Sequence, residues 1–291
     1  MLRLLIVDGH AYAYRAFHAI RELRAPSGRP SNAIYGFVKM LAKMRATLTP
    51  SHVLVVWDGG LDEKRMAALP EYKAQRPEMP ADLAEQIDEI VAYLKAAGIA
   101  SYCEDGVEAD DYIACVARRA AADGVEVVIA SSDKDFMQLV APGIGLLNPN
   151  DKTEAVWTAE QVRAKAGVEP HQIVDWLALI GDSVDNIPGV PGVGTKTAAQ
   201  LLAQFGSLSG LYARLNEVKS ERTRTALAAA TDAVTRNVQL IRLREDLPCN
   251  YDLNELHEKA ADVESLREQF KRWGFRSMLA ELESHRQEVL L

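Results

Sequence analysis

The sequence predicts an α/β fold, in which helices flank a central and mostly parallel sheet. Short, continuous apolar runs of the kind found in buried parallel strands occur at 4–7, 53–57 and 125–130. Helical patterns separate or follow these runs, at 33–47, 83–97 and 109–122. Strands that alternate with helices in this way imply a parallel sheet with helices on its faces.

Length and composition are those of an ordinary globular protein. The chain has 291 residues, of which 48% are hydrophobic and 25% charged, which suits one large domain or two small ones. No apolar run is long enough for a membrane span, and we expect neither a signal segment nor a membrane partner. The three cysteines lack a CxxC spacing, so they indicate a reducing compartment, and we expect a cytoplasmic protein.

An aspartate follows each of the three predicted strands. These residues are Asp8, Asp58 and Asp133, and Asp135 comes two positions after the last. A single Asp-Gly after a strand is usually a turn. Because the carboxyl ends of parallel strands meet at one edge of a sheet, where ligands bind, three such acids together favour a shared acidic pocket.

The predicted helix 109–122 begins with a second group of acids, Glu108, Asp110 and Asp111. Acids in a first turn can cap backbone N–H groups and suit the helix dipole, which explains one or two of them. Three carboxylates in four positions repel one another. A divalent cation, which prefers oxygen ligands, would offset that repulsion.

Asp182 and Asp185 form a third group, in a loop after the apolar helix predicted at 173–180. Locally they are ordinary turn residues. Pooled with the other acids they make an all-carboxylate set without histidine or cysteine, which suits magnesium or manganese and hence phosphate chemistry. Two such ions could activate a water and stabilise a leaving oxygen. The nine acids are Asp8, Asp58, Glu108, Asp110, Asp111, Asp133, Asp135, Asp182 and Asp185.

The net charge of −8 does not exclude a polyanionic substrate, since without those nine acids the chain would carry +1. Two basic or glycine-rich segments are candidates for phosphate contact. Segment 61–82, broken by Pro70, Pro77 and Pro80, is either a solvated loop or a basic segment over the acidic pocket. Its cations and stackable ring are Lys64, Arg65, Tyr72, Lys73 and Arg76.

The second segment, 187–198, has glycines at short intervals before a helix that we expect to begin near Thr195. It is either a plain glycine-rich hairpin or, as we favour, a turn whose N–H groups grip a DNA backbone without reading its sequence. It lacks the spacing of a P-loop. Further along, we expect helices over 211–244 and 263–270, loops at 142–145 and 148–153, and weak helical order from 281.

These motifs together resemble the bacterial 5′-nuclease family, which comprises the 5′→3′ exonuclease domain of DNA polymerase I and free-standing relatives akin to flap endonucleases. The resemblance extends to about Phe275. The matching stretches are 5–9, 14–17, Asp58, 71–77, 106–111, 133–135, 138–139, 181–188 and 189–198. Lys64 departs from the pattern, because many relatives have an aromatic residue there.

The resemblance implies a PIN-like α/β catalytic domain over 1–170 with a helical arch at 61–82. It also implies a helical DNA-binding subdomain over 171–291 with a helix–three-turn–helix at about 173–205. The implied activity is two-metal hydrolysis of DNA with 5′ flaps, nicks or free 5′ ends, for primer and flap removal in replication and repair. Two Mg²⁺, with Mn²⁺ as a substitute, K⁺ at the turn, RNA primers in hybrids, a fused or separate polymerase, a monomeric state and the bacterial nucleoid are further expectations.

Site roles also follow from the resemblance. Five of the acids, Asp8, Asp58, Glu108, Asp110 and Asp111, would serve mainly one metal, and the other four the second. Lys73 and Arg76 would approach the scissile phosphate as catalytic cations, and Tyr72 would stack on a base. The implied DNA contacts are Tyr14, Arg15, Arg65, Tyr72, Gly189, Gly192, Val193, Gly194, Lys196 and Thr197.

Three other functions compete with this hypothesis. A non-catalytic binder of DNA junctions would not need the complete acidic set. An aspartyl-nucleophile phosphatase needs Asp-x-Asp on the first strand, whereas Gly9 and His10 follow Asp8 here. A related RNA-cleaving nuclease on the same sheet lacks the long glycine turn.

Overall fold

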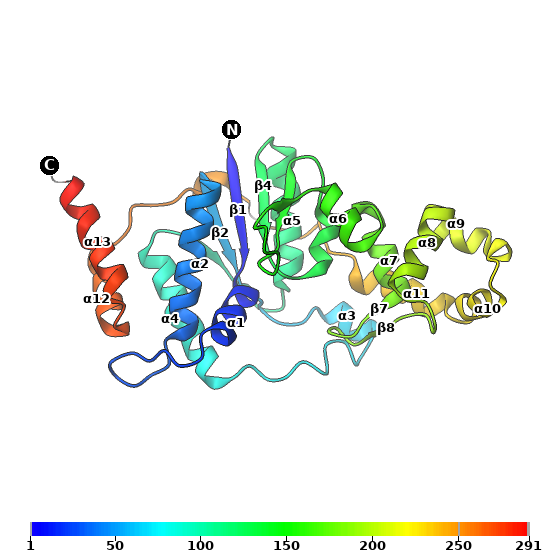
Figure 1. Ribbon diagram of the computed structural model, residues 1–291, viewed down its shortest axis with the longest axis horizontal. Helices are drawn as coiled ribbons and strands as arrows, with labels where there is room; N and C mark the ends of the chain where they lie inside the picture. The colour runs from blue at the N-terminus through cyan, green and yellow to red at the C-terminus, as the bar shows by residue number, and fades with distance from the viewer. Residues whose placement is uncertain (1, 250, 290–291) are drawn as a thin grey trace.

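The computed structural model describes residues 2–249 and 251–289 and has a six-stranded sheet at its centre (Figure 1). The strand order is β3-β2-β1-β4-β5-β6, and all neighbours pair in parallel except β5 with β6. The predicted parallel sheet is thereby confirmed. The strands are β1 (Arg3–Asp8), β2 (His52–Val56), β3 (Ala100–Tyr102), β4 (Glu126–Ala130), β5 (Ile144–Leu147) and β6 (Val156–Trp157).

Helices cover both faces of the sheet, which is why the central strands are apolar throughout. Leu5 and Val7 point to the face packed by the α1–α2 layer, and Leu4 and Ile6 point to the α5 layer. The first layer consists of α1 (Gly9–Ala19), α2 (Asn32–Leu48) and α4 (Ala81–Ala96). The second begins with α5 (Ala109–Ala122) and continues through α6 (Ala159–Ala166).

A helical lobe extends from the second layer, at the right of Figure 1. It starts with η2 (Pro170–Gln172), α7 (Ile173–Ile180) and a two-stranded ribbon of β7 (Gly181–Asp182) and β8 (Ile187–Pro188). It continues with α8 (Thr195–Phe205), α9 (Leu208–Ala213), η3 (Leu215–Glu217), α10 (Glu221–Ala229) and α11 (Thr231–Ile241). Helix α7 runs between the sheet layer and the lobe, and packs against both α8 and α11.

After α11 the chain returns to the opposite end of the molecule. Following η4 (Leu253–Leu256), α12 (Val263–Trp273) and α13 (Arg276–Val289) lie beside α2 and α4 (Figure 1). Phe270 and Trp273 are buried in the core of the first layer. The predicted helical unit 171–291 is therefore divided, because only its first part, to α11, forms the lobe.

Several local predictions were wrong. Residues 144–147 form β5, although 142–145 were predicted as a loop, and the short strands β3 and β6 carry too few apolar residues to be recognised. Helix α13 (Arg276–Val289) includes the residues from 281, for which weak helical order stays a prediction. Within 61–82 the predicted helical arch is helical only over α3 (Glu63–Ala68) and at the start of α4, since Pro70, Pro77 and Pro80 interrupt it. None of the described helices has the length and apolarity needed to span a membrane.

Glycine is required where β1 passes into α1. A Cβ on Gly9 would lie 2.7 Å from two ring carbons of Trp57, whose ring is buried against Phe37. We expect Gly9→Ala to lower the free energy of unfolding by about 1–3 kcal/mol, although alanine favours helix. Gly194→Ala is the matched control, because a Cβ there meets nothing within 4 Å. Urea denaturation of both variants is the measurement, and equal stability would show that Trp57 moves aside at no cost.

Candidate acidic metal centre

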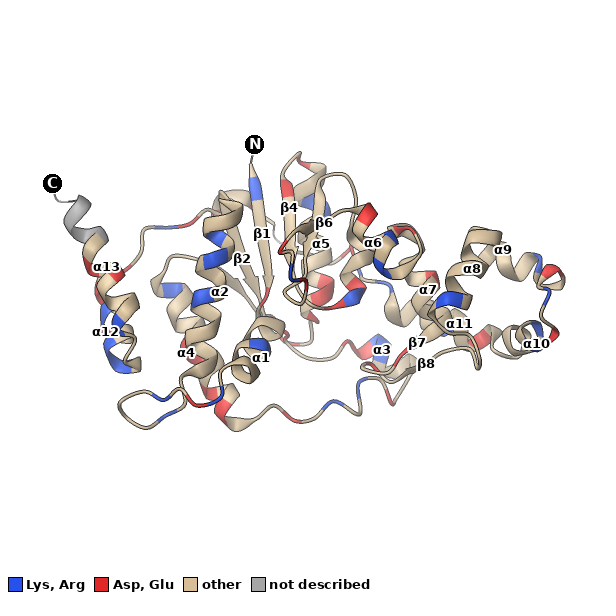
Figure 2. Ribbon diagram, viewed as in Figure 1, with Lys and Arg blue, Asp and Glu red and all other residues tan. Residues whose placement is uncertain are grey.

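The acids that follow the strands meet at the topological switch point of the sheet, between β1 and β4. Asp8 ends β1 and Asp133 follows β4, and these two neighbouring strands are parallel. After β1 the next strands, β2 and β3, lie on one side of the pair, whereas after β4 the strands β5 and β6 lie on the other side. A crevice forms beyond the strand ends at such a switch point. In Figure 2 the lower ends of β1 and α5 are both acidic. A pocket of about 710 Å³ opens here, lined by Asp8, Asp58, Asp110, Asp133 and Asp182 among others.

Asp8 is fixed by both of its oxygens. Its Oδ1 accepts the Ala11 N–H at 3.0 Å as the N-cap of α1, and its Oδ2 accepts the Ser131 hydroxyl at 2.7 Å. The same hydroxyl oxygen accepts the Asp133 N–H at 3.1 Å. Ser131 thus links the ends of β1 and β4. In the sequence, the only signal for Ser131 is its position two residues before Asp133.

A second group of acids lies on the side of the helical lobe. Oxygen atoms of Asp135, Asp182 and Asp185 lie within 4.8 Å of one another, and all three residues are buried. The Oδ1 of Asp135 is buried without a hydrogen-bond partner among the described residues. A buried carboxylate oxygen with no donor is costly, and a cation is the partner that would satisfy it.

The ribbon β7–β8 carries Asp182 and Asp185 to this point. A Cβ on Gly181 would lie 2.4 Å from the backbone nitrogen of Gly189, and one on Gly189 would lie 2.2 Å from Ile180. The two glycines therefore allow the chain to enter and leave the ribbon in close contact. Asn237 holds that crossing, because its amide donates to the carbonyls of Ala178 and Pro188 at 3.1 and 2.8 Å.

Burial and mutual repulsion raise the pKa values of these acids. Burial, with smaller contributions from Asp133 and Asp58, raises the pKa of Asp8 to about 6, although Ala11 and Ser131 oppose it. The pKa values of Asp110 and Asp135 rise well above the ordinary value, first through burial and then through Asp133. Carboxylate oxygens that lack nearby positive charge are suitable ligands for a hard divalent cation.

Three cationic side chains of segment 61–82 contact acids among the nine, namely Arg65, Lys73 and Arg76. Lys73 has a left-handed backbone (φ 56°), its N–H donates to the Asp185 carbonyl at 3.0 Å, and its Nζ lies 2.7 Å from Glu108. Arg76 donates to Asp185 at 2.8 Å. A strained, buried lysine held from both sides is typical of a functional site. Burial opposes the charge of Lys73, yet Asp110, Asp185 and Glu108 raise its pKa.

Some predicted contacts do not fit this structure. Tyr72 is 3% exposed and its hydroxyl donates to Glu108 at 3.2 Å, so its ring offers no face for stacking on a base. Arg65 is buried and committed to Asp111, which removes it from contact with DNA. Val193 is a core residue whose N–H is taken by the Val190 carbonyl at 3.0 Å. In each case tertiary contacts occupy the group that was expected to meet DNA.

The glycine turn leads into α8 with exposed backbone. Gly194 precedes α8 and has no side chain to cap it, while Gly192 has a left-handed φ of 80°. Gly192, Gly194 and Lys196 are exposed, and Gly189 and Thr197 are half-buried. The first N–H groups of α8 and the Lys196 ammonium therefore face solvent together, as an anion-binding helix N-terminus requires.

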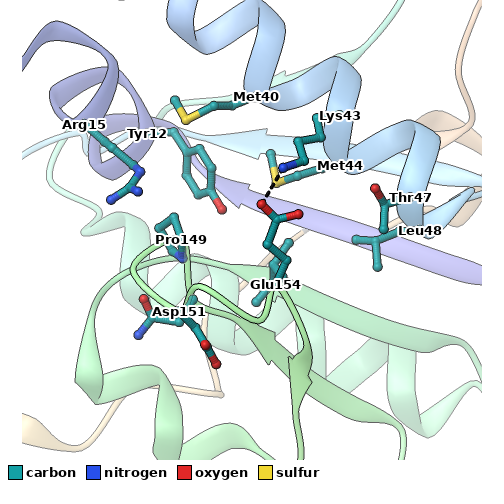
Figure 3. Close-up of a pocket in the computed structure, with 12 residues that line it drawn as sticks. Tyr12, Arg15, Met40, Lys43, Met44, Thr47, Leu48, Pro149, Asp151 and Glu154 are labelled. Atoms are coloured by element: carbon teal, nitrogen blue, oxygen red, sulfur yellow. Dashed lines mark hydrogen bonds and ion pairs between the residues drawn. The ribbon is translucent and has the colours of Figure 1, made fainter. Parts of the chain in front are cut away.

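Helix α1 presents its two predicted DNA contacts to different places. Tyr14 lines the acidic pocket. Arg15 is exposed and points to a separate cavity of about 260 Å³ between α2 and the loop 148–154 (Figure 3). Lys43 and Glu154, which both line that cavity, form an ion pair with each other. The cavity contains none of the nine acids and is separate from the acidic centre.

His10 is a further residue of the acidic pocket that the sequence did not single out. Its Nδ1 accepts the Asp58 N–H at 3.0 Å, which places the ring proton on Nε2 in the neutral form. Burial lowers the pKa of His10, although Asp58 opposes this. A neutral ring therefore holds the start of the Asp58 turn against α1.

Family models cover most of the chain. Residues 3–167 match the N-terminal, resolvase-like domain of 5′-3′ exonucleases, and residues 168–264 match the C-terminal SAM fold of the same family. The division at 167–168 coincides with the start of the helical lobe. It assigns α7 and the ribbon β7–β8 to the C-terminal unit.

Curated relatives agree in sequence. The chain is 38% identical over 284 residues to the 5′-3′ exonuclease of Aquifex aeolicus, of which it covers 96%. It is equally identical over 284 residues to DNA polymerase I of Bacillus caldotenax, of which it covers 32%. The chain thus spans about a third of the polymerases that it matches.

Solved structures share the fold. The D15 protein of bacteriophage T5, co-crystallised with metal ions, superposes with a TM-score of 0.69 at 23% identity over 83% of this chain and 89% of the phage protein. The catalytic core of Rad2 in complex with a DNA substrate gives a TM-score of 0.64 at 18% identity, over 93% and 87% of the two chains.

The raised pKa values predict how the stability of the metal-free protein depends on pH. The pKa of the Asp8 carboxyl is about 6 in the folded state and 3.8 in the unfolded state. Its protonation therefore stabilises the fold fully below pH 3.8, and this stabilisation is lost as the pH rises through 6. Burial raises the pKa of Glu108, but Lys73 and Arg65 lower it by more. Glu108 therefore stabilises the fold at neutral pH and loses this effect only in more acidic solution.

We therefore expect the melting temperature without metal to fall between about pH 4 and 7, by about 2–4 °C per kcal/mol lost. Saturating Mg²⁺ at pH 8 should restore it, because metal binding replaces the protons. Asp8→Asn should reduce the pH dependence. Thermal melts at four pH values test this, and a melting temperature that rises with pH in chelator would contradict the assignment.

Proposed function

The chain belongs to the 5′-3′ exonuclease family, and on this basis we propose that it hydrolyses DNA phosphodiesters near free 5′ ends and 5′ flaps with two divalent metal ions. One observation carries the proposal. The acids Asp135, Asp182 and Asp185 converge without enough donors, next to Asp8 and Asp133, and Lys73 and Arg76 lie beside them. An acidic centre flanked by cations suits a phosphate that must be held and attacked.

The residues divide the work by charge. The cations would be held by acids that line or adjoin the pocket, and we propose Mg²⁺ with Mn²⁺ as a substitute. These acids are Asp8, Asp58, Asp110, Asp133, Asp135, Asp182 and Asp185. When bound, the two ions activate a water and stabilise the leaving oxygen of an in-line displacement. Arg76, whose side chain is 38% exposed, would neutralise an oxygen of the scissile phosphate, and Lys73, which is buried and paired with Glu108, would add positive charge from the interior. No serine or cysteine nucleophile is required.

The duplex would dock on the helical lobe. The exposed N–H groups at the start of α8, together with Lys196, suit backbone phosphates and carry no base specificity. The carbonyls of the same turn would suit K⁺. Segment 69–80, which runs along the strand-end edge of the sheet from α3 to α4 (Figure 1), would bound the path of the 5′ strand to the acids.

We also propose a place in replication and repair, because many of the relatives are DNA polymerases of bacteria. The chain would act as a monomer on the cytoplasmic nucleoid, fused to a polymerase or in step with one. Nicks, flaps and RNA primers in hybrid with DNA are the substrates that such a role requires.

The first test is a cleavage assay on a labelled 5′-flapped duplex, with a blunt duplex and a single strand of the same sequence alongside. We expect Mg²⁺-dependent cuts near the flap junction and none in chelator. Asp135→Ala should lower kcat more than ~100-fold, since residues that merely orient metal ligands already contribute 10–100-fold, while flap binding stays measurable. Binding without cleavage in both Mg²⁺ and Mn²⁺ would refute the proposed nuclease activity and indicate a non-catalytic protein that binds DNA junctions.

A second test separates chemistry from docking. Lys73→Ala should lower kcat by about 10²–10³-fold, as for other groups that stabilise transition-state charge, and change KM less than about threefold. Lys196→Ala is the matched comparison, and it should raise KM and leave kcat nearly unchanged. The reverse ranking would make Lys73 a docking residue.

A further inference from the structure

Asp111 lies next to Asp110 in α5 but faces another part of the molecule. Successive helical residues are about 100° apart around the axis. Asp110 lines the acidic pocket, whereas Asp111 is 1% exposed and lies against α3 and residues 240–244. Asp110 and Asp111 are adjacent in the sequence, but they contact different parts of the molecule.

Three donors use both oxygens of Asp111. Its Oδ2 accepts Arg65 Nη1 at 2.8 Å, and its Oδ1 accepts Arg65 Nη2 at 2.8 Å and the Arg244 backbone N–H at 2.9 Å. Arg65 is itself 5% exposed. A buried, two-pronged guanidinium–carboxylate pair is costly to open, because each charge would be left without water or partner. A metal ion would have to displace it.

The other donors of Arg65 connect this pair to the end of α11. Its Nε donates to the Leu240 carbonyl at 3.0 Å and Nη2 donates to the Arg242 carbonyl at 3.2 Å. Arg244 closes the connection, because its Nη1 donates at 2.8 Å to Asp62, the residue that caps α3. Three elements thus meet at four side chains, which we name the joint: Asp62, Arg65, Asp111 and Arg244.

The joint also sets Glu108, one turn before Asp111 on the same chain. Arg65 Nη1 lies 3.1 Å from the carboxylate of Glu108, which Lys73 also contacts, and the Asp62 N–H donates to Glu108 at 3.1 Å. A shift of α11 relative to α5 would therefore displace the group that holds Lys73.

We propose that Asp111, Arg65 and Arg244 are positioning residues, which hold the lobe and the base of segment 61–82 at a fixed angle to the acidic centre. Asp111 binds no metal ion in this arrangement, and Arg65 contacts no DNA. The proposal rests on the proposed function only for its turnover readout, since metal affinity and stability test it independently.

The first experiment titrates Mn²⁺ in the absence of DNA and follows the free ion by electron paramagnetic resonance. Asp111→Asn should bind Mn²⁺ within about threefold of the wild-type affinity, whereas the ligand variant Asp135→Asn should lose about tenfold or more. Asp123→Asn, at the exposed far end of α5, is the matched control and should resemble the wild type. A loss in Asp111→Asn equal to that in Asp135→Asn would overturn the proposal.

The second experiment is a double-mutant cycle. Asp111→Asn leaves Glu108 as the remaining charged partner of Arg65, and Arg65→Gln leaves Asp111 a buried carboxylate without a cation, while the double variant restores a neutral amide pair. We expect the double variant to melt above both single variants. In turnover on the flapped duplex, Asp111→Asn should lower kcat about tenfold or more at nearly constant KM, and the double variant should recover part of it. A double variant no better than Asp111→Asn in either readout would overturn the proposal.

Arg244→Gln provides a milder variant if Asp111→Asn does not fold, because the Arg244 side chain is 35% exposed. It should lower kcat and leave Mn²⁺ affinity unchanged, and loss of Mn²⁺ affinity would count against the joint. A wild-type protein that cuts no flapped DNA would refute the proposed function alone, because the Mn²⁺ titration and the melting cycle still judge the joint.

Discussion

Repulsion between buried carboxylates is the constraint around which the structure is arranged. Asp8, Asp110, Asp133 and Asp135 all have raised pKa values because burial and their neighbours disfavour the charged form. A fold stabilised only by its core would not keep these groups together. Local N–H and hydroxyl donors hold individual acids in place, but they do not neutralise the centre as a whole.

Cations from elsewhere in the chain supply part of the missing charge, and they do so unequally. Glu108 and Asp111 receive full ion pairs from Lys73 and Arg65, so they are satisfied within the protein. Lys134 and Arg76 reach Asp182 and Asp185 from partly exposed positions, where solvent screens them. The least compensated group is Asp135 with its neighbours, which is where an added cation gains most.

The same contacts tie the two halves of the molecule together. The sheet contributes Asp8 and Asp133, whereas the ribbon after α7 contributes Asp182 and Asp185, so the centre exists only while the lobe keeps its place. Asn237 and the Gly181–Gly189 crossing fix the ribbon, and the contacts of Arg65 fix the end of α11. Stability of the lobe interface and geometry of the site are therefore one requirement.

The sequence by itself determined the parallel sheet, its main helices and the meeting of Asp8, Asp58 and Asp133 at one edge. These follow from apolar runs, helical periodicity and the rule that strand ends share an edge, all of which are local or topological. It also placed helix α8 after the glycine turn, because caps and turns depend on neighbouring residues.

Only the tertiary structure decided which charges pair. Asp110 and Asp111 look alike in the sequence, yet one lines the pocket and the other is bound by Arg65 from a segment 46 positions earlier. Tyr72 and Val193 are likewise buried in the interior. Ser131 is important because its hydroxyl donates to Asp8, which is 123 positions away in the sequence. Side-chain partnership across such separations depends on packing, and no spacing rule along the chain contains it.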